Sequence, residues 1–277
     1  MKHNQTPIRV IQPLVQIRAE PNGTSEVISQ AIFSEELHIL EKAGEWLKVM
    51  TPWDNYTGWI KQEGVCNVPD TYTSRLNVES VWVDRLTAHI YHVKDTIYGP
   101  LMTLPYNSRL VLVQPVAHHS DRWLNVLLPD GKEVFIQSGD VVSTRPLLSN
   151  DQACELALTF LGLPYTWGGR SSFGYDCSGF VQMLYQARGV NLPRDAKDQA
   201  KMGGFSDVAL TSLKEGDLLF FGFAEDAIKH VAMSLGEDLF IHTCASVENA
   251  PYLRISSLKD PAWNGKGFYP HRLGRRL

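Results

Sequence analysis

An internal repeat in the first half of the chain constrains its fold more than any other feature. Residues 41–65 read EKAGEWLKVMTPWDNYTGWIKQEGV, and residues 114–141 read QPVAHHSDRWLNVLLPDGKEVFIQSGDV. Each copy has a strand-like run, a polar turn, the pattern W-L-x-V, a second turn and an aromatic-isoleucine pair before a glycine. Two repeats of about 65 residues each predict two similar modules and not a solenoid.

Short β-type runs fill both copies of the repeat. They are VIQPLVQI, EELHILEKA, WLKVMT and YTGWIK in the first copy, and AHIYHV, SRLVLVQPV, WLNVLLP and KEVFIQ in the second. Gly, Pro, Asn and Asp separate these runs, which is typical of small all-β barrels. We therefore expect one barrel over residues 1–70 and another over residues 71–146.

The chain changes character from Leu147. Residues 151–165, DQACELALTFLGLPY, predict a helix that begins near Asp151. Its apolar positions form a single stripe: Ala153, Leu156, Ala157, Phe160 and Leu161. Three strand-like runs come later, GDLLFFGF, HVAMSLG and LFIHTC. Helices followed by an antiparallel meander indicate an α+β domain over residues 147–277.

Composition and charge narrow the partners. A formal net charge of -4 gives no basic surface for nucleic acid, and we expect the basic HRLGRRL at residues 271–277 to be a solvated end. No apolar stretch is long enough to span a membrane, so no membrane contact is expected. The start, MKHNQTPIRVIQP, lacks the apolar segment of a secretory signal. We therefore expect a cytoplasmic protein, or an extracytoplasmic one if a leader preceded this sequence.

Cysteine usage points to reduced thiols. The four cysteines lie far apart, at positions 66, 154, 177 and 244, without a CxxC pair. This spacing favours neither a disulfide framework nor a zinc knuckle. We expect no metal or other cofactor, and a monomer is the simplest assembly, with the oligomeric state left open.

One of these cysteines stands where a nucleophile is expected. Residues 165–179, YTWGGRSSFGYDCSG, turn sharply and lead into FVQMLYQARG, which predicts a helix ending at Gly189. Asp176 and Ser178 are residues that favour helix N-termini. Cys177 therefore lies in the first helical turn, where the helix dipole and a neighbouring imidazole lower a thiol pKa.

Two later histidines complete a papain-type set. His230 lies in KHVAMSL, where strand alternation places it with Ala232, on the face opposite Val231. His242 follows on the next predicted strand, and adjacent antiparallel strands place side chains beside one another. We therefore expect Cys177 as nucleophile, His230 as base and His242 as the residue that orients it.

Each residue also has a structural interpretation. A buried cysteine is usually an inert apolar side chain, and a lone strand histidine is usually a packed one. A zinc site made of Cys177, His230, His242 and Cys244 is a further alternative, but the paired short spacings of structural zinc are missing. The combination with the sharp turn and Asp-Cys-Ser-Gly favours catalysis.

Residues 150–272 closely resemble the NlpC/P60 cysteine peptidases. The segments LPYTWGG, DCSGF, LPRDA, GDLLFF, KHVAMSLG and IHTCAS occur in the family's order. The first half resembles bacterial SH3 (SH3b) domains through Arg18 to Pro21, Trp46 to Val49 and Gly58 to Ile60. The second copy has Val134-Phe135-Ile136 in place of G-W-I and is expected to be mainly structural. The resemblance implies a papain-like α+β catalytic domain preceded by two all-β SH3b-like barrels.

The resemblance also implies an activity and its residues. It makes Cys177, His230 and His242 catalytic, puts Tyr165 near the oxyanion, and implies hydrolysis of the bond from γ-D-glutamate to meso-diaminopimelate or L-lysine in murein peptides. The subgroup that joins two SH3b modules to this domain accepts peptides with a free N-terminal L-alanine and releases L-Ala-D-Glu. In that subgroup the first SH3b module helps to wall off the substrate cleft.

Binding such an ammonium group requires carboxylates and hydroxyls. The candidates are Asp195 and Ser178, together with Tyr56 and Glu26 from the first SH3b-like module, where Glu26 is preferred to Glu20. Asp195 could instead cap the next helix, and Tyr56 could pack in its barrel. The subgroup often has a hydroxyl residue where this chain has Ala196.

Two other functions remain open at this point. A non-catalytic protein could use the SH3b pair to attach to cell-wall polymer. An acyltransferase on a related fold would need an apolar channel or a membrane-contacting segment, and the sequence indicates neither.

Overall fold

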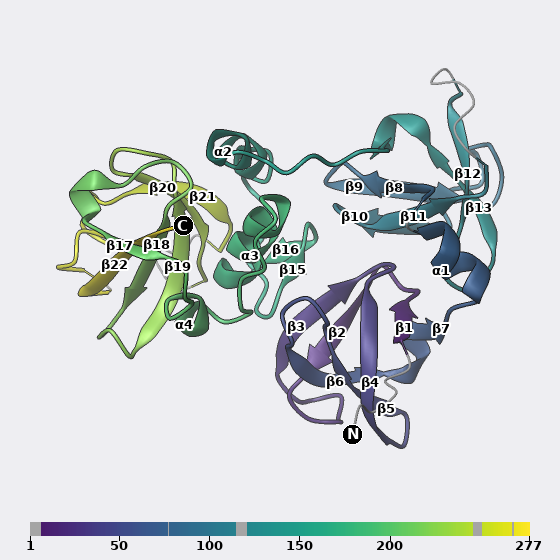
Figure 1. Cartoon of the computed structure of the whole chain (residues 1–277), viewed down its shortest axis with the longest axis horizontal. Helices are drawn as coiled ribbons and strands as arrows, with labels where there is room; N and C mark the ends of the chain where they lie inside the picture. The colour runs from purple at the N-terminus through teal and green to yellow at the C-terminus, as the bar shows by residue number, and fades with distance from the viewer. Residues whose placement is uncertain (1–6, 77, 115–120, 246–250, 268) are drawn as a thin grey trace. The chain divides into compact units, whose positions relative to one another are not determined.

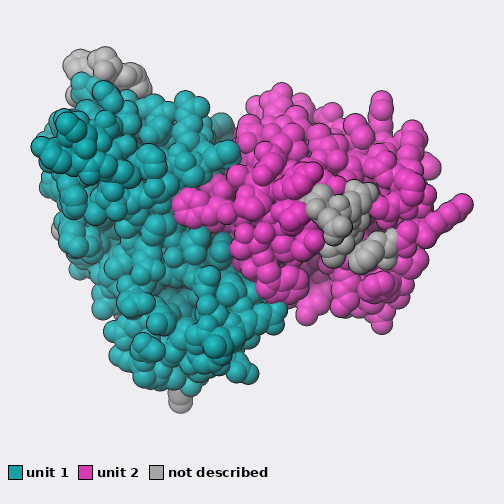
Figure 2. Space-filling view, turned by 180° about the vertical axis from the view of Figure 1, so that it is seen from behind, with its two compact units in different colours: residues 1–146 teal, residues 147–277 magenta. Residues whose placement is uncertain are grey.

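The computed structural model describes residues 7–76, 78–114, 121–245, 251–267 and 269–277. The chain divides into two compact units, Met1–Pro146 and Leu147–Leu277, which Figure 2 colours separately. The first unit is built from two antiparallel sheets, and the second from a six-stranded sheet, a two-stranded hairpin and helices (Figure 1).

The first sheet has seven strands in the order β3-β2-β6-β5-β4-β1-β7. They are β1 (Pro7–Val10), β2 (Leu14–Arg18), β3 (Val27–Ile32), β4 (Glu36–Ala43), β5 (Trp46–Met50), β6 (Thr57–Lys61) and β7 (Val65–Asn67). Alternate side chains, such as Val15 and Ile17 on β2, enter a single core with Leu47, Val49 and Ile60. Gly58 is required in β6, because a Cβ there would lie 2.5 Å from Ile17 Cγ2.

The second sheet repeats this topology strand for strand, in the order β10-β9-β13-β12-β11-β8-β14. Its strands are β8 (Ser80–Val83), β9 (Thr87–Tyr91), β10 (Met102–Pro105), β11 (Arg109–Leu112), β12 (Trp123–Leu127), β13 (Glu133–Gln137) and β14 (Val141–Val142). Each sheet also has a short 3-10 turn before its last strand, η1 (Gln62–Gly64) and η2 (Ser138–Asp140). The sequence repeat is therefore a repeat of topology.

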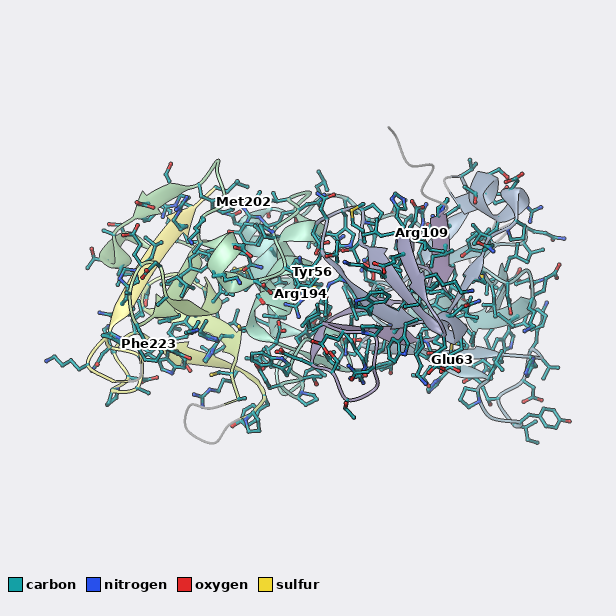
Figure 3. The ribbon with its side chains drawn as sticks, turned by 90° about the horizontal axis from the view of Figure 1, so that it is seen from below. Tyr56, Glu63, Arg109, Arg194, Met202 and Phe223 are labelled. Carbon is teal, nitrogen blue, oxygen red and sulfur yellow. The ribbon has the colours of Figure 1, made fainter. Side chains whose placement is uncertain are left out.

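Helix α1 (Asp70–Leu76) joins the two sheets. Its Tyr72 is fully buried, and the hydroxyl lies 2.8 Å from Ser34 Oγ of the first sheet. Leu76 packs with Val111 of β11, while Arg109, labelled in Figure 3, stacks on Trp82 with its guanidinium 5.0 Å from the ring centroid. The connection between the two sheets is thus itself packed, with a polar contact to the first sheet and an apolar contact to the second.

The second unit has a six-stranded sheet in the order β17-β22-β18-β19-β20-β21. The strands are β17 (Ser206–Val208), β18 (Leu218–Gly222), β19 (Ile228–Ser234), β20 (Leu239–Thr243), β21 (Leu253–Ser257) and β22 (His271–Arg276). A separate hairpin pairs β15 (Arg170–Ser171) with β16 (Gly174–Tyr175). The helices are α2 (Asn150–Leu158), α3 (Cys177–Ala187) and α4 (Ala196–Gln199), with the 3-10 turn η3 (Leu210–Ser212).

Two expectations about this unit are wrong. The basic HRLGRRL is not a solvated end: it forms β22, which lies between β17 and β18. It fits there because Gly274 is buried and Arg276 pairs with the buried Asp217. The first helix ends at Leu158, well before residue 165, and leaves Leu161 43% exposed, because Gly162 adopts a left-handed conformation ahead of Pro164.

Candidate active site

Helix α3 begins at Cys177, as the sequence predicts. Asp176 is its N-cap, and Oδ1 of Asp176 accepts a 2.7 Å hydrogen bond from the Gly179 amide. The turn before the helix packs backbone on backbone: a Cβ at Gly179 would lie 2.2 Å from the Gly169 carbonyl oxygen. Because these glycines have no side chain, the backbone of the turn can pack directly against the first turn of α3. This packing fixes the position of Cys177 at the start of the helix.

The environment of the Cys177 sulfur favours the thiol. Cys177 as a residue is half-buried, but its sulfur lies among protein atoms, and this burial, with the charge of Asp176, raises the pKa of the thiol to about 12. The Val231 amide and Arg194 oppose that rise. The expectation of a lowered pKa is therefore not met in this structure. A base must take the proton when the sulfur attacks.

His230 and His242 lie side by side on β19 and β20, as the strand pattern predicts. His230 Nε2 is 2.9 Å from His242 Nδ1, and His242 Nε2 is 3.0 Å from Ser256 Oγ on β21. Burial lowers the pKa of His230 to about 3 and also lowers that of His242, which the charge of His230 lowers further. Both rings are therefore neutral at neutral pH.

Four aromatic side chains enclose the histidine pair: Phe221, Phe240, Trp263 and Tyr269. The Trp263 ring centroid lies 4.7 Å from that of His242 and 5.4 Å from that of His230. The Tyr269 ring stacks parallel to His230 at 6.3 Å. This aromatic enclosure excludes water from both imidazoles, which explains why their pKa values fall.

The structure brings three further predicted residues to the same unit. Tyr165 is half-buried, and its pKa is raised by burial and then by the charge of Cys177. Ser178 is buried beside Cys177. Asp195 is the N-cap of α4, yet its side chain makes no capping hydrogen bond. The capping alternative for that carboxylate therefore loses its support.

Tyr56 and Glu26 belong to the first unit. Tyr56 (Figure 3) is half-buried in the turn before β6, and Glu26 is exposed just before β3. Their substrate-binding roles stay predictions.

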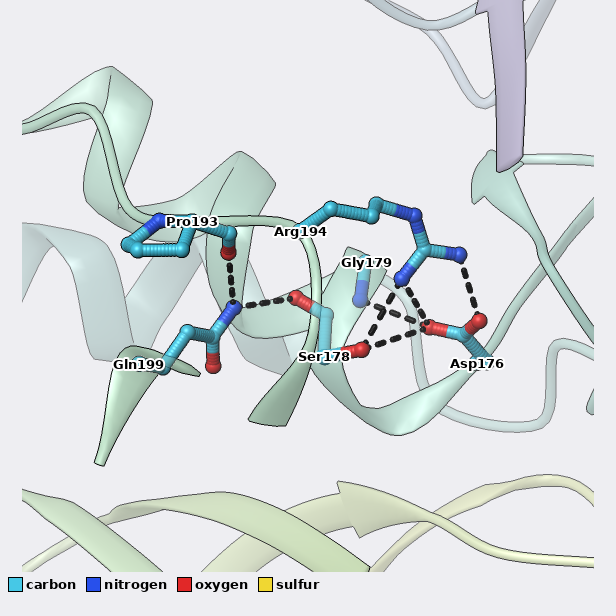
Figure 4. A network of polar contacts seen from close by, with 6 residues as sticks. All are labelled: Asp176, Ser178, Gly179, Pro193, Arg194 and Gln199. Carbon is cyan, nitrogen blue, oxygen red and sulfur yellow. Dashed lines mark hydrogen bonds and ion pairs between the residues drawn. The ribbon is translucent and has the colours of Figure 1, made fainter. Parts of the chain in front are cut away.

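Sequence reasoning missed Arg194. The residue is 2% exposed and lies within LPRDA, directly before Asp195. Its guanidinium grips both oxygens of Asp176 and also reaches Ser178 Oγ (Figure 4). An arginine beside a proline in a short apolar segment was the available signal, but only the fold reveals which carboxylate it meets. Ser256 was missed for the same reason.

Neither a metal cluster nor a membrane span emerges from the described residues. They contain no group of three or more His, Cys, Asp or Glu side chains that could hold a metal ion. Among the helices of the described segments, none is long and apolar enough to cross a membrane.

Comparison with known proteins places both parts of the chain. Residues 162–270 match the NlpC/P60 family, and residues 17–65 match the bacterial dipeptidyl-peptidase Sh3 domain. A γ-D-glutamyl-L-lysine dipeptidyl-peptidase of Bacillus cereus is 31% identical over 235 residues, which cover 80% of this chain and 68% of that protein. Its namesake in Bacillus subtilis is 31% identical over 230 residues, which cover 79% of this chain and 73% of that protein.

A solved structure agrees on the fold. The crystal structure of an NlpC/P60 family protein from Bacillus cereus superposes with a TM-score of 0.82 over 98% of this chain and 99% of that chain, at 23% identity. A cysteine at a helix start, a buried histidine pair and this similarity over most of the length agree with one another. The chain belongs to the NlpC/P60 family and is a peptidase that acts on peptidoglycan peptides.

Proposed function

We propose that this peptidase hydrolyses the bond between γ-D-glutamate and the diamino acid of murein peptides that have a free N-terminal L-alanine. The products are L-Ala-D-Glu and the diamino acid or the remaining peptide. The observation that carries the proposal is the chain of hydrogen bonds from His230 through His242 to Ser256, within the unit whose helix α3 begins at Cys177. The similarity to two γ-D-glutamyl-L-lysine dipeptidyl-peptidases supports the substrate class.

The hydrogen bonds of the histidine pair define the direction of proton transfer. Since His230 Nε2 bonds to His242 Nδ1, His230 can act as base through Nδ1 only if its Nε2 donates to His242. His242 then carries its proton on Nε2 and donates it to Ser256 Oγ. Both residues thus hold His230 in the tautomer that accepts a proton.

The reaction then follows the ordinary course of a thiol peptidase. Cys177 Sγ gives its proton to His230 and attacks the γ-carbonyl carbon, and His230 passes that proton to the departing amine. A water molecule, deprotonated by His230, hydrolyses the thioester and frees the dipeptide. Because both the thiol and the imidazole start neutral, proton transfer accompanies attack.

Asp195 and Ser178 are the proposed ligands of the substrate ammonium in the catalytic unit. The Ser178 hydroxyl accepts from Arg194 and donates to Asp176. As far as the described residues go, its second oxygen lone pair can therefore accept from the ammonium. One oxygen of the Asp195 carboxylate lies 3.9 Å from Lys197 Nζ. Tyr56 and Glu26 are proposed to add to this binding on the resemblance alone, and the two sheets of the first unit are proposed to be two SH3b modules that meet near residue 70.

The test is incubation with L-Ala-γ-D-Glu-meso-diaminopimelate, with its L-lysine analogue, and with both peptides N-acetylated. The wild type should release L-Ala-D-Glu from the free peptides and far less from the acetylated ones, while Cys177→Ala should release none. Equal cleavage of acetylated peptides would remove the free-amine requirement. No cleavage of any of them by the wild type would contradict the proposed bond.

A further inference from the structure

The strongest feature that the mechanism does not use is a buried polar network around the start of α3. It consists of Arg194, Asp176 and Ser178, with Gln199 joined to it (Figure 4). The Arg194 and Asp176 side chains are 1% and 11% exposed. A buried ion pair is retained at a cost in desolvation, so its position beside a nucleophile calls for a functional reason.

Arg194 and Asp176 form a bidentate ion pair. Arg194 Nη1 donates to Asp176 Oδ1 at 3.0 Å, and Arg194 Nη2 donates to Oδ2 at 2.5 Å. The same Oδ1 accepts from the Gly179 amide at 2.7 Å. The guanidinium therefore fixes the plane of the carboxylate that caps the helix, and the capping bond in turn fixes the first turn, where Cys177 lies.

The network also reaches the segment that carries Asp195. Gln199 Nε2 donates to the Ser178 carbonyl at 3.1 Å and to the Pro193 carbonyl at 2.8 Å. Arg194 Nη1 donates to Ser178 Oγ at 2.9 Å. Hydrogen bonds from Arg194 and from Gln199 therefore tie both ends of the segment 193–199 to the first turn of α3.

Charge gives the pair a second role. Asp176 directly precedes Cys177, and a negative charge on its carboxylate opposes formation of a thiolate. The Arg194 guanidinium, bonded to the same carboxylate, supplies the compensating positive charge. The helix thus keeps an acidic cap without exposing the sulfur to an unbalanced negative charge.

We propose that Arg194 is a positioning residue for the nucleophile: it holds the Asp176 carboxylate at the N-cap of α3 and neutralises that charge beside Cys177. The proposal rests on Cys177 being the nucleophile of the proposed function. It predicts that the reactivity of the sulfur depends on the charge at positions 176 and 194 jointly.

The experiment measures carboxamidomethylation of Cys177 by iodoacetamide in the full chain as a function of pH, with the modified cysteine identified by mass spectrometry. The thiolate is the reacting species, so below the pKa the rate falls about tenfold for each unit by which the thiol pKa rises. Arg194→Met should have the highest thiol pKa, the wild type the next, Asp176→Asn/Arg194→Met a lower one, and Asp176→Asn the lowest.

Arg194→Lys separates charge from geometry. Lysine keeps the positive charge but cannot form two parallel hydrogen bonds to the Asp176 carboxylate. The pKa of the Cys177 thiol in this variant should therefore stay close to that of the wild type, while kcat falls and KM changes little. The other titratable groups near the sulfur are Tyr165, Cys244 and Tyr269, with His230 preceding the Val231 amide, and they are unchanged in every variant.

An unchanged thiol pKa in a folded Arg194→Met chain would overturn the proposal. If that variant does not fold, the comparison moves to the double variant and Asp176→Asn, which differ only at position 194, and equal pKa values there would overturn it as well. Alkylation needs no turnover. A wild type that cleaves no murein peptide would therefore contradict the proposed function and leave this order of pKa values intact to be measured.

Discussion

At the scale of single residues, burial shifts the pKa of each member of the proposed catalytic set toward its neutral form. Burial holds the Cys177 thiol and the two imidazoles neutral at once. In a neutral imidazole one ring nitrogen carries the proton and the other can accept one. The hydrogen bonds from His230 through His242 to Ser256 select which nitrogen of His230 is the acceptor.

Ser256→Ala should lower kcat roughly fivefold, because the lost hydrogen bond contributes about 1 kcal/mol to holding the reactive tautomer. Initial rates with the free tripeptide check this. Ser257→Ala is the matched control on the same strand, since within the described part of the chain the Ser257 hydroxyl bonds a local amide, that of Lys259. A kcat equal to that of the wild type in Ser256→Ala would show that His242 is oriented without the hydroxyl.

The buried histidines should also make the catalytic unit sensitive to acid. Their folded pKa values lie below the unfolded value near 6.5, so the unfolded state binds more protons between about pH 6.5 and the lowered pKa. Stability therefore falls as the pH falls through this window, by up to about 1.4 kcal/mol per pH unit for each histidine.

Urea unfolding at several pH values, followed by hydrogen exchange in α3, measures this slope for the second unit. His242→Gln, which removes one of the two groups, should show a shallower decline with acid than the wild type. A decline that is equally steep in both chains would mean that other groups cause it.

At the scale of elements, the sheet and the segment before β22 together lower the pKa of the two histidines, because each supplies aromatic side chains to their enclosure. Trp263 is 1% exposed, packs on both imidazoles, and its Nε1 has no hydrogen-bond partner among the described residues. Its contribution is therefore shape and exclusion of water.

Trp263→Leu should raise the pKa of the histidine pair toward its usual value, because water enters beside the rings. The acid limb of the pH profile of kcat/KM should then move to higher pH. Trp263→Phe, which keeps an aromatic ring, should move it less. An acid limb that stays in place in a folded Trp263→Leu chain would contradict this role.

An ion pair at the end of β22 joins this strand to a buried carboxylate. Arg276 donates to both oxygens of Asp217, at 2.8 and 2.6 Å, and Asp217 is 1% exposed. Arg276→Ala should lower the melting temperature of the second unit, because it leaves a buried carboxylate without that partner. Lys259→Ala, which removes an exposed ion pair with Asp238, is the control and should change it little.

At the scale of the whole molecule, the sequence predicts far more of the architecture than of the polar network. The repeat predicts two similar modules because strand alternation and turn residues are local signals. The catalytic roles of Cys177, His230 and His242 stay predictions, but their placement at a helix start and on adjacent strands is predictable from the same kind of local pattern. Arg194 and Ser256 are not, since each matters through a partner distant in sequence. Strand β22 was not predicted, because its many arginines resemble those of a solvent-exposed chain end.

The two units should be separable. The core that encloses the histidines, from Leu213 to Tyr269, draws only on residues of the second unit. Residues 147–277 expressed alone should therefore fold, with a cooperative melting transition and an alkylatable Cys177. A fragment that is molten, with retained helicity but no cooperative transition, would show that the first unit is required for its packing.

The place of β22 has a consequence for synthesis. The strand follows every other element of its sheet in sequence, yet it lies between β17 and β18. While the chain emerges from the ribosome, β18 has an open edge, and the strand beside it carries His230. The sheet that carries the proposed catalytic base is therefore completed last, so a chain cut short before residue 271 contains every proposed catalytic residue and still lacks the strand that joins β17 to β18.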